Sequence, residues 1–503
     1  MKIPNRASGV LLHVTSLPGP NGIGDFGPDA YRFVDWLEST GQSLWQWLPT
    51  TPIGPGDSPY QSVSAFAGSP LMVALEPLIE KKWLSSFAVA VPNQGNNEID
   101  FGRVIRFRYD ALRQAKVGFD AHGTENEKGS FATWRAENAD WLDEYALFAA
   151  IHQANDWRPW WEWDVLLKRR DASALAAARK TYANDVSFWQ FVQWCFDTQC
   201  QALKRYANAH GVALVGDLPI FVADNSADCW SRQDLYLLGD DGKPDVVAGV
   251  PPDDFGPNGQ RWGNPLYRWD RMKADGYSWW VSRVRRVLTQ CDVFRIDHFR
   301  GFAGYYEIPG ANDHAREGRW LVGPGKALFD ALEDALGQIP VIAEDLGLIT
   351  DDVIELRDSC GYPGMKILQF AFGGDGTHEF LPHNFTRNCI VYTGTHDTET
   401  AQGWFANAPE SARHFARTYL ACSDHDFHWG LIRAASNSVA KMAVFPLQDV
   451  LGLGAAARMN MPGSLGGSNW KWRFTWDMLG QEPSRVLRLM TAASGRAPIE
   501  MIR

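Results

Sequence analysis

Val293-Phe-Arg-Ile-Asp-His-Phe299 is a short stretch in which Val, Phe and Ile alternate with the polar residues Arg295, Asp297 and His298. Such a stretch, bounded by turn-forming residues, is typical of a buried strand in a parallel sheet. Seven further stretches of this kind lie at residues 10–14, 43–48, 213–221, 340–346, 365–370, 389–395 and 442–448. The sequence therefore predicts eight buried strands.

The segments between these strands have the periodicity of amphipathic helices. Four of them lie at residues 28–40, 279–289, 326–336 and 351–358. Strands that alternate with helices are typical of a parallel sheet covered by helices, and eight such units close most simply into a (β/α)₈ TIM barrel. The alternative is an open doubly wound sheet, but neither GxGxxG nor GxxxxGK[ST] follows a predicted strand. We expect an α/β protein in which residues 1–503 form one catalytic barrel.

Two long insertions interrupt the expected alternation. Residues 68–206, after the second strand, are rich in Ala, Trp, Arg and Glu at helical spacing, which predicts a mainly helical subdomain. Residues 224–270, after the third strand, are rich in Asp, Gly, Pro and Asn. A loop of this length is typically a lid or a disordered excursion, and Phe255 and Trp262 favour a lid.

Composition narrows the function classes. The chain has 503 residues, of which 45% are hydrophobic and 21% charged, as expected of a globular protein. The formal net charge is −11 and no block of Lys and Arg occurs, so neither a nucleic acid nor an anionic membrane surface is an expected partner. No run approaches the roughly 18 apolar residues of a membrane helix. The seven cysteines stand singly without a CxxC pair, which is typical of reduced thiols and predicts a cytoplasmic location.

Tryptophan is unusually abundant, with 23 Trp against 14 Tyr. An indole ring serves either to fill a core or to stack on the flat face of a ligand. Trp157, Trp160, Trp161 and Trp163 are expected to pack the helical insertion against the barrel. Trp230, Trp262 and Trp404 lie near predicted strand ends and are candidates for a ligand groove.

Polar residues cluster at the carboxyl ends of four predicted strands, where a barrel of this kind holds its active site. They are Asp217, Arg295 with Asp297, Glu344 with Asp345, and His396 with Asp397. Three carboxylates could hold a divalent metal, or two could serve as nucleophile and acid in glycosyl transfer. Arg295 argues against a metal, because a fixed cation beside Asp297 competes with it. Glycosyl chemistry is therefore favoured.

Arg295 and Asp297 lie two residues apart on one strand. Period-two alternation places both on one face of the sheet, with His298 on the other face. Taken alone, the pair could be a structural ion pair that plugs the barrel mouth. Carboxylates at four strand ends favour a functional site.

The sequence resembles the 4-α-glucanotransferases, also called amylomaltases or disproportionating enzymes, within the wider α-amylase-like group. The resemblance is carried by Phe294-Arg-Ile-Asp-His-Phe-Arg-Gly301, Ile342-Ala-Glu-Asp-Leu-Gly347 and Tyr392-Thr-Gly-Thr-His-Asp397. Further segments match in the same order, among them Gly216-Asp-Leu-Pro-Ile-Phe-Val-Ala223, Gly259-Gln-Arg-Trp-Gly-Asn-Pro-Leu-Tyr267 and Asn469-Trp-Lys-Trp-Arg-Phe474. The resemblance extends over nearly the whole chain.

The resemblance implies a retaining double-displacement mechanism without a metal ion or organic cofactor. Asp297 would be the nucleophile, Glu344 the general acid and base, and Asp397 the residue that holds hydroxyls of the sugar at the cleaved bond. Arg295 would orient Asp297, and Asp217 would brace Arg295. The resemblance also implies that Tyr60 stacks under that sugar and that His298 and His396 contact its hydroxyls. Gln260 and Trp262 would lie over the acceptor side, and Phe370 would line the groove. The implied role of His298 conflicts with the strand alternation, which points its side chain away from Arg295 and Asp297. For His298 we follow the family resemblance.

The implied function is transfer of an α-1,4-glucan segment, such as a maltodextrin, to the 4-hydroxyl of an acceptor glucan or glucose. A hydrolase would use the same acids with water as acceptor. A non-catalytic glycan-binding protein on a barrel of this kind is the third alternative. The sequence does not identify a protein partner.

Overall fold

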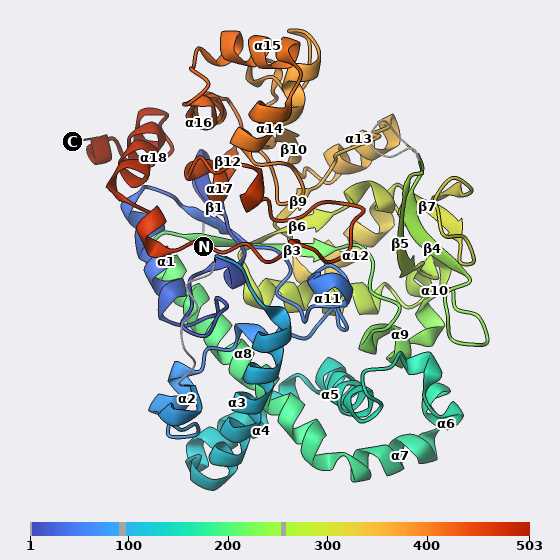
Figure 1. Ribbon diagram of the computed structural model, residues 1–503. Helices are drawn as coiled ribbons and strands as arrows, with labels where there is room; N and C mark the ends of the chain where they lie inside the picture. The colour runs from blue at the N-terminus through green and yellow to red at the C-terminus, as the bar shows by residue number, and fades with distance from the viewer. Residues whose placement is uncertain (1–2, 90–96, 253–257, 503) are drawn as a thin grey trace.

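The computed structural model describes residues 3–89, 97–252 and 258–502. At its centre eight parallel strands form one sheet, in the order β10-β11-β12-β1-β2-β3-β6-β9 (Figure 1). Their bounds are β1 Ala7–Leu11, β2 Leu44–Gln46, β3 Ala213–Pro219, β6 Val293–Asp297, β9 Val341–Ala343, β10 Gly364–Ile367, β11 Cys389–Tyr392 and β12 Met442–Pro446. All eight predicted strands are present, although each ends earlier than predicted because its last predicted residues lie in the loop, turn or short helix that follows.

The two end strands of this sheet, β9 and β10, meet and close the barrel. The Ala343 N–H donates to the Pro363 carbonyl at 2.9 Å. Just beyond β9, Asp345 Oδ1 accepts the Met365 N–H of β10 at 2.7 Å. The prediction of a (β/α)₈ TIM barrel is therefore confirmed.

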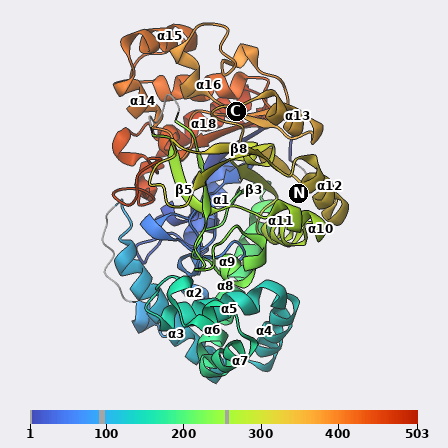
Figure 2. The same ribbon diagram turned by 90° about the vertical axis from the view of Figure 1, so that its right-hand side faces the viewer.

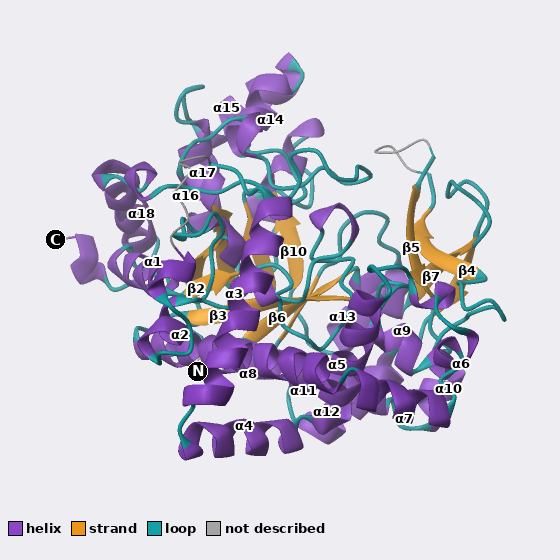
Figure 3. Ribbon diagram, turned by 60° about the horizontal axis from the view of Figure 1, so that its bottom comes forward, coloured by secondary structure: helices purple, strands orange, loops and turns teal. Residues whose placement is uncertain are grey.

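Helices surround the strands (Figure 3). The four predicted ones are α1 Pro28–Ser39, α11 Ser278–Gln290, α12 Lys326–Leu336 and α13 Asp351–Ser359. The later helices are α14 Ala401–Asn407, α15 Glu410–Leu420, α16 Phe427–Asn437, α17 Leu447–Val450 and α18 Gln481–Ala493. Helix α1 illustrates the local cause, since Pro28 occupies its first turn and Phe33 and Leu37 bury one face. None of the helices described in the structure is long and apolar enough to span a membrane.

In the described part of the chain, seven α-helices lie between β2 and β3 and form a lobe at one end of the molecule (Figure 2). They are α2 Glu76–Glu80, α3 Phe101–His122, α4 Glu125–Glu137, α5 Ala139–Ala154, α6 Val165–Lys168, α7 Ala172–Thr181 and α8 Ala183–Ala209. A buried, bidentate ion pair joins this lobe to the barrel: Arg286 of α11 donates to both oxygens of Asp197 in α8, at 2.7 and 2.6 Å. The two hydrogen bonds between these charges offset the desolvation cost of burying them.

The tryptophans of residues 157–163 have different surroundings. Trp160 is fully buried and its indole N–H donates to the Asp224 carbonyl at 2.9 Å. Trp163 packs edge-on against Trp230, with ring centres 5.5 Å apart. These two rings tie the lobe to the segment after β3, whereas Trp157 is 47% exposed. Trp230 is fully buried, so its expected place in a ligand groove is wrong.

A second, antiparallel sheet stands beside the barrel, in the order β5-β4-β7-β8 (Figure 1). It comprises β4 Val246–Val250, β5 Gln260–Pro265, β7 Gly304–Pro309 and β8 Arg319–Val322, with helices α9 Ala227–Ser231 and α10 Trp269–Ala274 nearby in the chain. The sequence predicted only a loop over residues 224–270. Strands β4 and β5 were not predicted, because β4 pairs with β7, which follows a different barrel strand, and the local sequence does not indicate such a distant partner. Phe255 lies outside the described residues.

Candidate active site

Arg295 is the centre of a hydrogen-bonded network where β3 and β6 end. The two strands pair with Asp217 opposite Arg295, which brings these side chains together. Arg295 Nη2 lies 2.8 Å from Asp217 Oδ2 and 2.8 Å from Asp297 Oδ1. Arg295 and Asp297 are thus in contact, as strand alternation predicts. The guanidinium is 5% exposed and serves two carboxylates at once.

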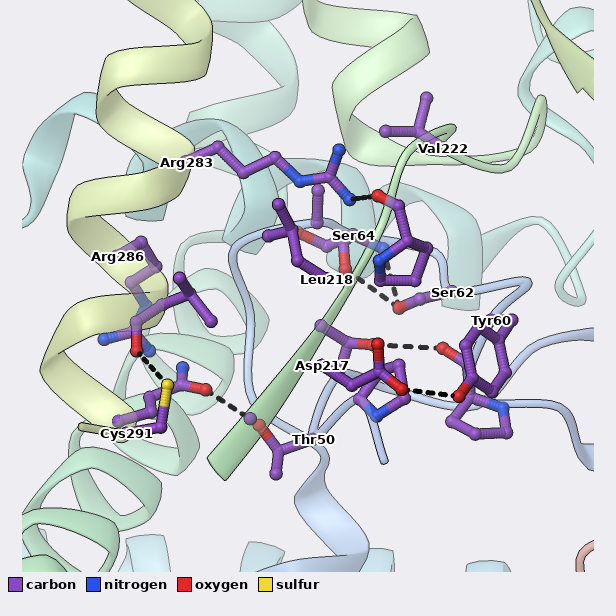
Figure 4. Close-up of a pocket in the computed structure, with 18 of the residues that line it drawn as sticks. Thr50, Tyr60, Ser62, Ser64, Asp217, Leu218, Val222, Arg283, Arg286 and Cys291 are labelled. Carbon is purple, nitrogen blue, oxygen red and sulfur yellow. Dashed lines mark hydrogen bonds between the residues drawn. The ribbon is translucent and has the colours of Figure 1, made fainter. Parts of the chain in front are cut away.

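Tyr60 completes this network from the loop after β2. Its hydroxyl donates to Asp217 Oδ2 at 2.7 Å (Figure 4). The same hydroxyl accepts from Arg295 Nη2 at 3.2 Å. Asp217 also borders a cavity between β3, α11 and residues 49–65, which Figure 4 shows. The hydroxyl bridge holds the tyrosine ring in a fixed position beside the carboxylates.

Glu344 follows β9 and is held by backbone groups. Its Oε2 accepts the His298 N–H at 2.7 Å and its Oε1 accepts the Leu346 N–H at 3.2 Å. Burial, followed by the negative charge of Asp297, raises the pKa of Glu344 to about 8. Glu344 is therefore protonated at neutral pH and able to act as an acid.

Asp297 has the opposite protonation state. Burial raises the pKa of its carboxyl group to about 6, while Arg295 lowers it and thereby keeps it below that of Glu344. At neutral pH the two carboxyl groups are one anion and one acid. Such a split between neighbouring carboxyls provides a nucleophile and a proton donor in the same site.

His298 lies directly after β6 in a left-handed conformation, with φ 53° and ψ 51°. The strand pleat ends at Asp297, so alternation does not predict where the His298 ring points. The ring packs edge-on against Trp262 with centres 4.7 Å apart, and its Nε2 is buried with no hydrogen-bond partner among the residues that the structure describes. Burial lowers the pKa of this imidazole to about 3, so it is neutral and has an unfilled hydrogen-bonding position.

His396 and Asp397 follow β11. The His396 ring stacks on Tyr60, with centres 5.3 Å apart and planes 7° apart. Its Nε2 lies 3.3 Å from Asp397 Oδ2. Burial lowers the pKa of His396. A continuous series of contacts therefore runs from Asp397 through His396 and Tyr60 to Asp217.

Gln260 and Trp262 lie on β5, in the antiparallel sheet. Trp262 donates its indole N–H to Gln260 Oε1 at 3.1 Å, and its carbonyl accepts from Gln61 at 3.2 Å. Phe370 lies in the turn after β10, is 38% exposed and stacks on Phe380. The contacts described above join every predicted site residue except Phe370 into one cluster. Trp404 instead stacks on Phe427, as a helix-packing residue.

Sequence reasoning missed three residues at this site. Asn460 donates to Asp397 Oδ1 at 2.6 Å, and Arg458 donates to the Asp397 carbonyl at 2.7 Å. Trp470 packs near both Tyr60 and His396. These residues lie beyond the last barrel strand, whereas the predicted site residues lie at strand ends or in family motifs. Only the matching segment Asn469–Phe474, which contains Trp470, indicated this region.

The fold and the site together define a class of protein. A barrel with a protonated and an ionised carboxyl group at neighbouring strand ends, and aromatic rings around them, is typical of enzymes that act on glycosidic bonds.

Comparisons with known proteins define the family. A family model described as 4-alpha-glucanotransferase matches residues 12–478. The 4-alpha-glucanotransferase of Thermus thermophilus is 44% identical over 504 residues, spanning 99% of this chain and 100% of the relative. That of Synechocystis sp. is 43% identical over 499 residues, spanning 98% and 99%. The structure titled amylomaltase from Streptococcus agalactiae in complex with acarbose has a TM-score of 0.95 at 36% identity and covers 98% of this chain and 100% of its own. The chain belongs to the 4-alpha-glucanotransferase family, which confirms the resemblance found in the sequence.

Proposed function

We propose that the chain transfers a segment of an α-1,4-glucan to the 4-hydroxyl of an acceptor glucan or glucose, by a retaining double displacement. The observation that carries the proposal is the pair of environments: Arg295 contacts Asp297 Oδ1 at 2.8 Å, whereas Glu344 accepts from the His298 and Leu346 N–H groups. This arrangement favours the anion of Asp297 and leaves the pKa of Glu344, raised by burial and by that anion, the higher of the two. It supplies an acid and an anion in one site at neutral pH, as this chemistry requires.

In the first step, Glu344 donates its proton to the glycosidic oxygen while a carboxylate oxygen of Asp297 attacks the anomeric carbon. The bond to the leaving glucan breaks and a covalent glycosyl ester forms on Asp297. Arg295, 2.8 Å from Asp297 Oδ1, orients the attacking carboxylate. Asp397 holds hydroxyls of the reacting sugar.

In the second step, ionised Glu344 takes the proton of the acceptor's 4-hydroxyl. The resulting oxygen attacks the anomeric carbon and displaces Asp297, which returns both carboxyl groups to their starting states. Water in place of the acceptor would give hydrolysis. The family membership favours transfer over hydrolysis and over a non-catalytic role.

The remaining contacts are part of the same proposal. His298, through its unpartnered Nε2, and His396 bind sugar hydroxyls, and Tyr60 stacks under the sugar. Gln260 and Trp262 of β5, within the insertion predicted at residues 224–270, cover the acceptor side, and Phe370 lines the groove. Residues 68–206 are a subdomain inserted in one catalytic barrel. The cytoplasmic location stays a prediction from the cysteine pattern.

Incubation with maltotriose tests the function. Transfer gives glucose together with longer maltodextrins, whereas reducing ends that accumulate without longer products would indicate a hydrolase. The mechanism is tested with α-maltosyl fluoride, whose leaving group needs little acid help. Glu344→Gln should accumulate a glycosyl adduct on Asp297, detectable by mass spectrometry, and Asp297→Asn should not. A Glu344→Gln enzyme that turns over maltotriose at the wild-type rate would refute the assignment.

A further inference from the structure

The short segment 458–460 makes two contacts with the third acid of the site and one with the residue before it. The Asn460 N–H donates to the His396 carbonyl at 3.0 Å, and Arg458 Nη2 donates to the Asp397 carbonyl at 2.7 Å. The Asn460 side-chain amide donates to Asp397 Oδ1 at 2.6 Å. Backbone and side chain of Asp397 are therefore both held by a part of the chain that is more than 60 residues away in sequence.

Asn460 is itself fixed on both sides. Its carbonyl accepts from Arg458 Nε at 2.7 Å, and the neighbouring Met459 carbonyl accepts the Trp470 N–H at 2.8 Å. Trp470 takes a left-handed conformation with φ 67°, which is unfavourable for a residue with a side chain. This conformation places its ring 5.7 Å from that of Tyr60. An amide held in this way has little freedom to leave Asp397.

The chemical type of the contact matters. Asp397 is half-buried, and its Oδ2 faces His396 Nε2 at 3.3 Å. A neutral amide on Oδ1 fixes the carboxylate without neutralising its negative charge, whereas a cation there would form an ion pair. Oδ2 keeps its remaining capacity for hydroxyl groups of a sugar.

We propose that Asn460 is a positioning residue for the glucan-transfer reaction, which orients the Asp397 carboxylate toward the sugar at the cleaved bond. This inference rests on the role proposed for Asp397. Since Asp397 would hold the sugar most firmly in its distorted, transition-state geometry, loss of Asn460 is expected to lower kcat more than it raises KM.

The first test measures kcat and KM of Asn460→Ala with maltotriose. We expect kcat to fall about 10- to 100-fold, the range of a lost hydrogen bond to a charged group, while KM changes less than about threefold. Asn437→Ala, on an exposed residue of α16, is the matched control and should behave as wild type. Apparent Tm values are measured for all variants.

The second test uses Asn460→Asp, which has the same shape but places two carboxyl groups side by side. When both carboxyl groups are ionised, they repel each other and Asp397 moves. When the pair holds one proton, a hydrogen bond between the two carboxyl groups replaces the one that the Asn460 amide made. The ratio of variant to wild-type kcat should therefore rise as the pH is lowered from about 8 to about 5. The ratio for Asn460→Ala, which does not titrate, should stay constant.

The negative charge that Asn460→Asp adds also raises the pKa of Asp297, as that of Asp397 does, so each pH profile is corrected for its own acid limb before the ratios are compared. The groups that face the pair formed by Asp397 and residue 460 are His396, Arg458, Glu399, Arg295, Asp297 and Tyr60. Arg458 approaches the Asp397 carbonyl and the Glu399 carboxylate rather than the side chain of Asp397.

The outcomes separate the two proposals. Asp397→Asn is measured alongside, and wild-type kcat in that variant would refute the function proposed for Asp397. If Asp397→Asn is inactive but Asn460→Ala keeps wild-type kcat, only the positioning role of Asn460 is wrong. Equal pH dependence of the Asn460→Asp and Asn460→Ala ratios would also overturn it, because a purely structural role predicts no recovery at low pH.

Discussion

Arg295 donates from two nitrogens to the same oxygen of Asp217, Nε at 3.1 Å and Nη2 at 2.8 Å, across the paired strands β3 and β6. The two side chains are 5% and 0% exposed. The same Nη2 also faces Asp297 Oδ1. One buried cation is thus shared between a bracing carboxylate and the carboxylate proposed as nucleophile, and the charge of the first influences the second.

Asp217→Asn should move the acid limb of the pH profile. The negative charge of Asp217 raises the pKa of Asp297, and Arg295 lowers it. Without the negative charge of Asp217, the positive charge of Arg295 acts on Asp297 unopposed by it. The pKa of Asp297 therefore falls, and the acid limb of kcat/KM shifts to lower pH. The profile is measured with maltotriose, with exposed Asp330→Asn as control. A shift to higher pH would contradict the electrostatic argument.

The wild-type enzyme should have a bell-shaped pH dependence of kcat/KM. Asp297 must be ionised and Glu344 protonated, and their pKa values are about 6 and about 8. Activity should therefore fall below about pH 6, as Asp297 takes up a proton, and above about pH 8, as Glu344 loses one. Rates with α-maltosyl fluoride as donor give the control, because the first step then needs little acid. A basic limb that persists for formation of the glycosyl ester would argue against Glu344 as its origin.

Glu344→Gln should be more stable than wild type at neutral pH. The pKa of Glu344 is raised from 4.5 in the unfolded chain to about 8 in the folded one. Stability contributed by this group is fully present below pH 4.5 and is lost as the pH rises toward 8. A glutamine does not titrate, so the Tm difference in favour of Glu344→Gln should widen from about pH 4.5 to about pH 8 and then level off. A constant difference would mean that the carboxyl is not perturbed.

Asp345→Ala should have the opposite pattern, although Asp345 is the adjacent residue. The side chain of Asp345 is 4% exposed. It accepts the Met365 N–H where β9 meets β10 and forms an ion pair with Arg357. Truncation leaves the N–H and the guanidinium without these partners and should lower the unfolding free energy by about 3 kcal/mol. Urea unfolding measures the loss, with exposed Asp352→Ala as control. At a temperature where the variant is folded, kcat should remain within about tenfold of wild type, unlike Glu344→Gln.

Removal of divalent metal ions should not affect turnover. The cation beside the proposed nucleophile is Arg295, and it occupies the side of Asp297 where a metal would compete. Maltotriose disproportionation is measured before and after dialysis against EDTA. A loss of activity that Ca²⁺ or Mg²⁺ restores would show that the carboxylates bind a metal that Arg295 does not replace.

Most of the barrel and the polar residues at its strand ends could be predicted from the sequence. Apolar runs such as 389–395 and alternating side chains such as Arg295 and Asp297 are local patterns, and one strand suffices to produce them. His298 could not be placed in this way, because its left-handed backbone interrupts the pattern at the position that matters. The pairing of β4 with β7 could not be predicted either, because the periodicity of one segment does not indicate which distant segment it pairs with.

The sequence by itself therefore determined the barrel and the family, and it identified Asp297, Glu344 and Asp397 as the acids of the proposed mechanism, because strand periodicity and family motifs are properties of contiguous residues. Tertiary structure alone decided how the environments of Glu344 and Asp297 separate their pKa values, and that Asn460 hydrogen-bonds Asp397. A pKa depends on burial and on charges brought close by folding, and Asn460 reaches Asp397 only after the chain has passed around the whole barrel.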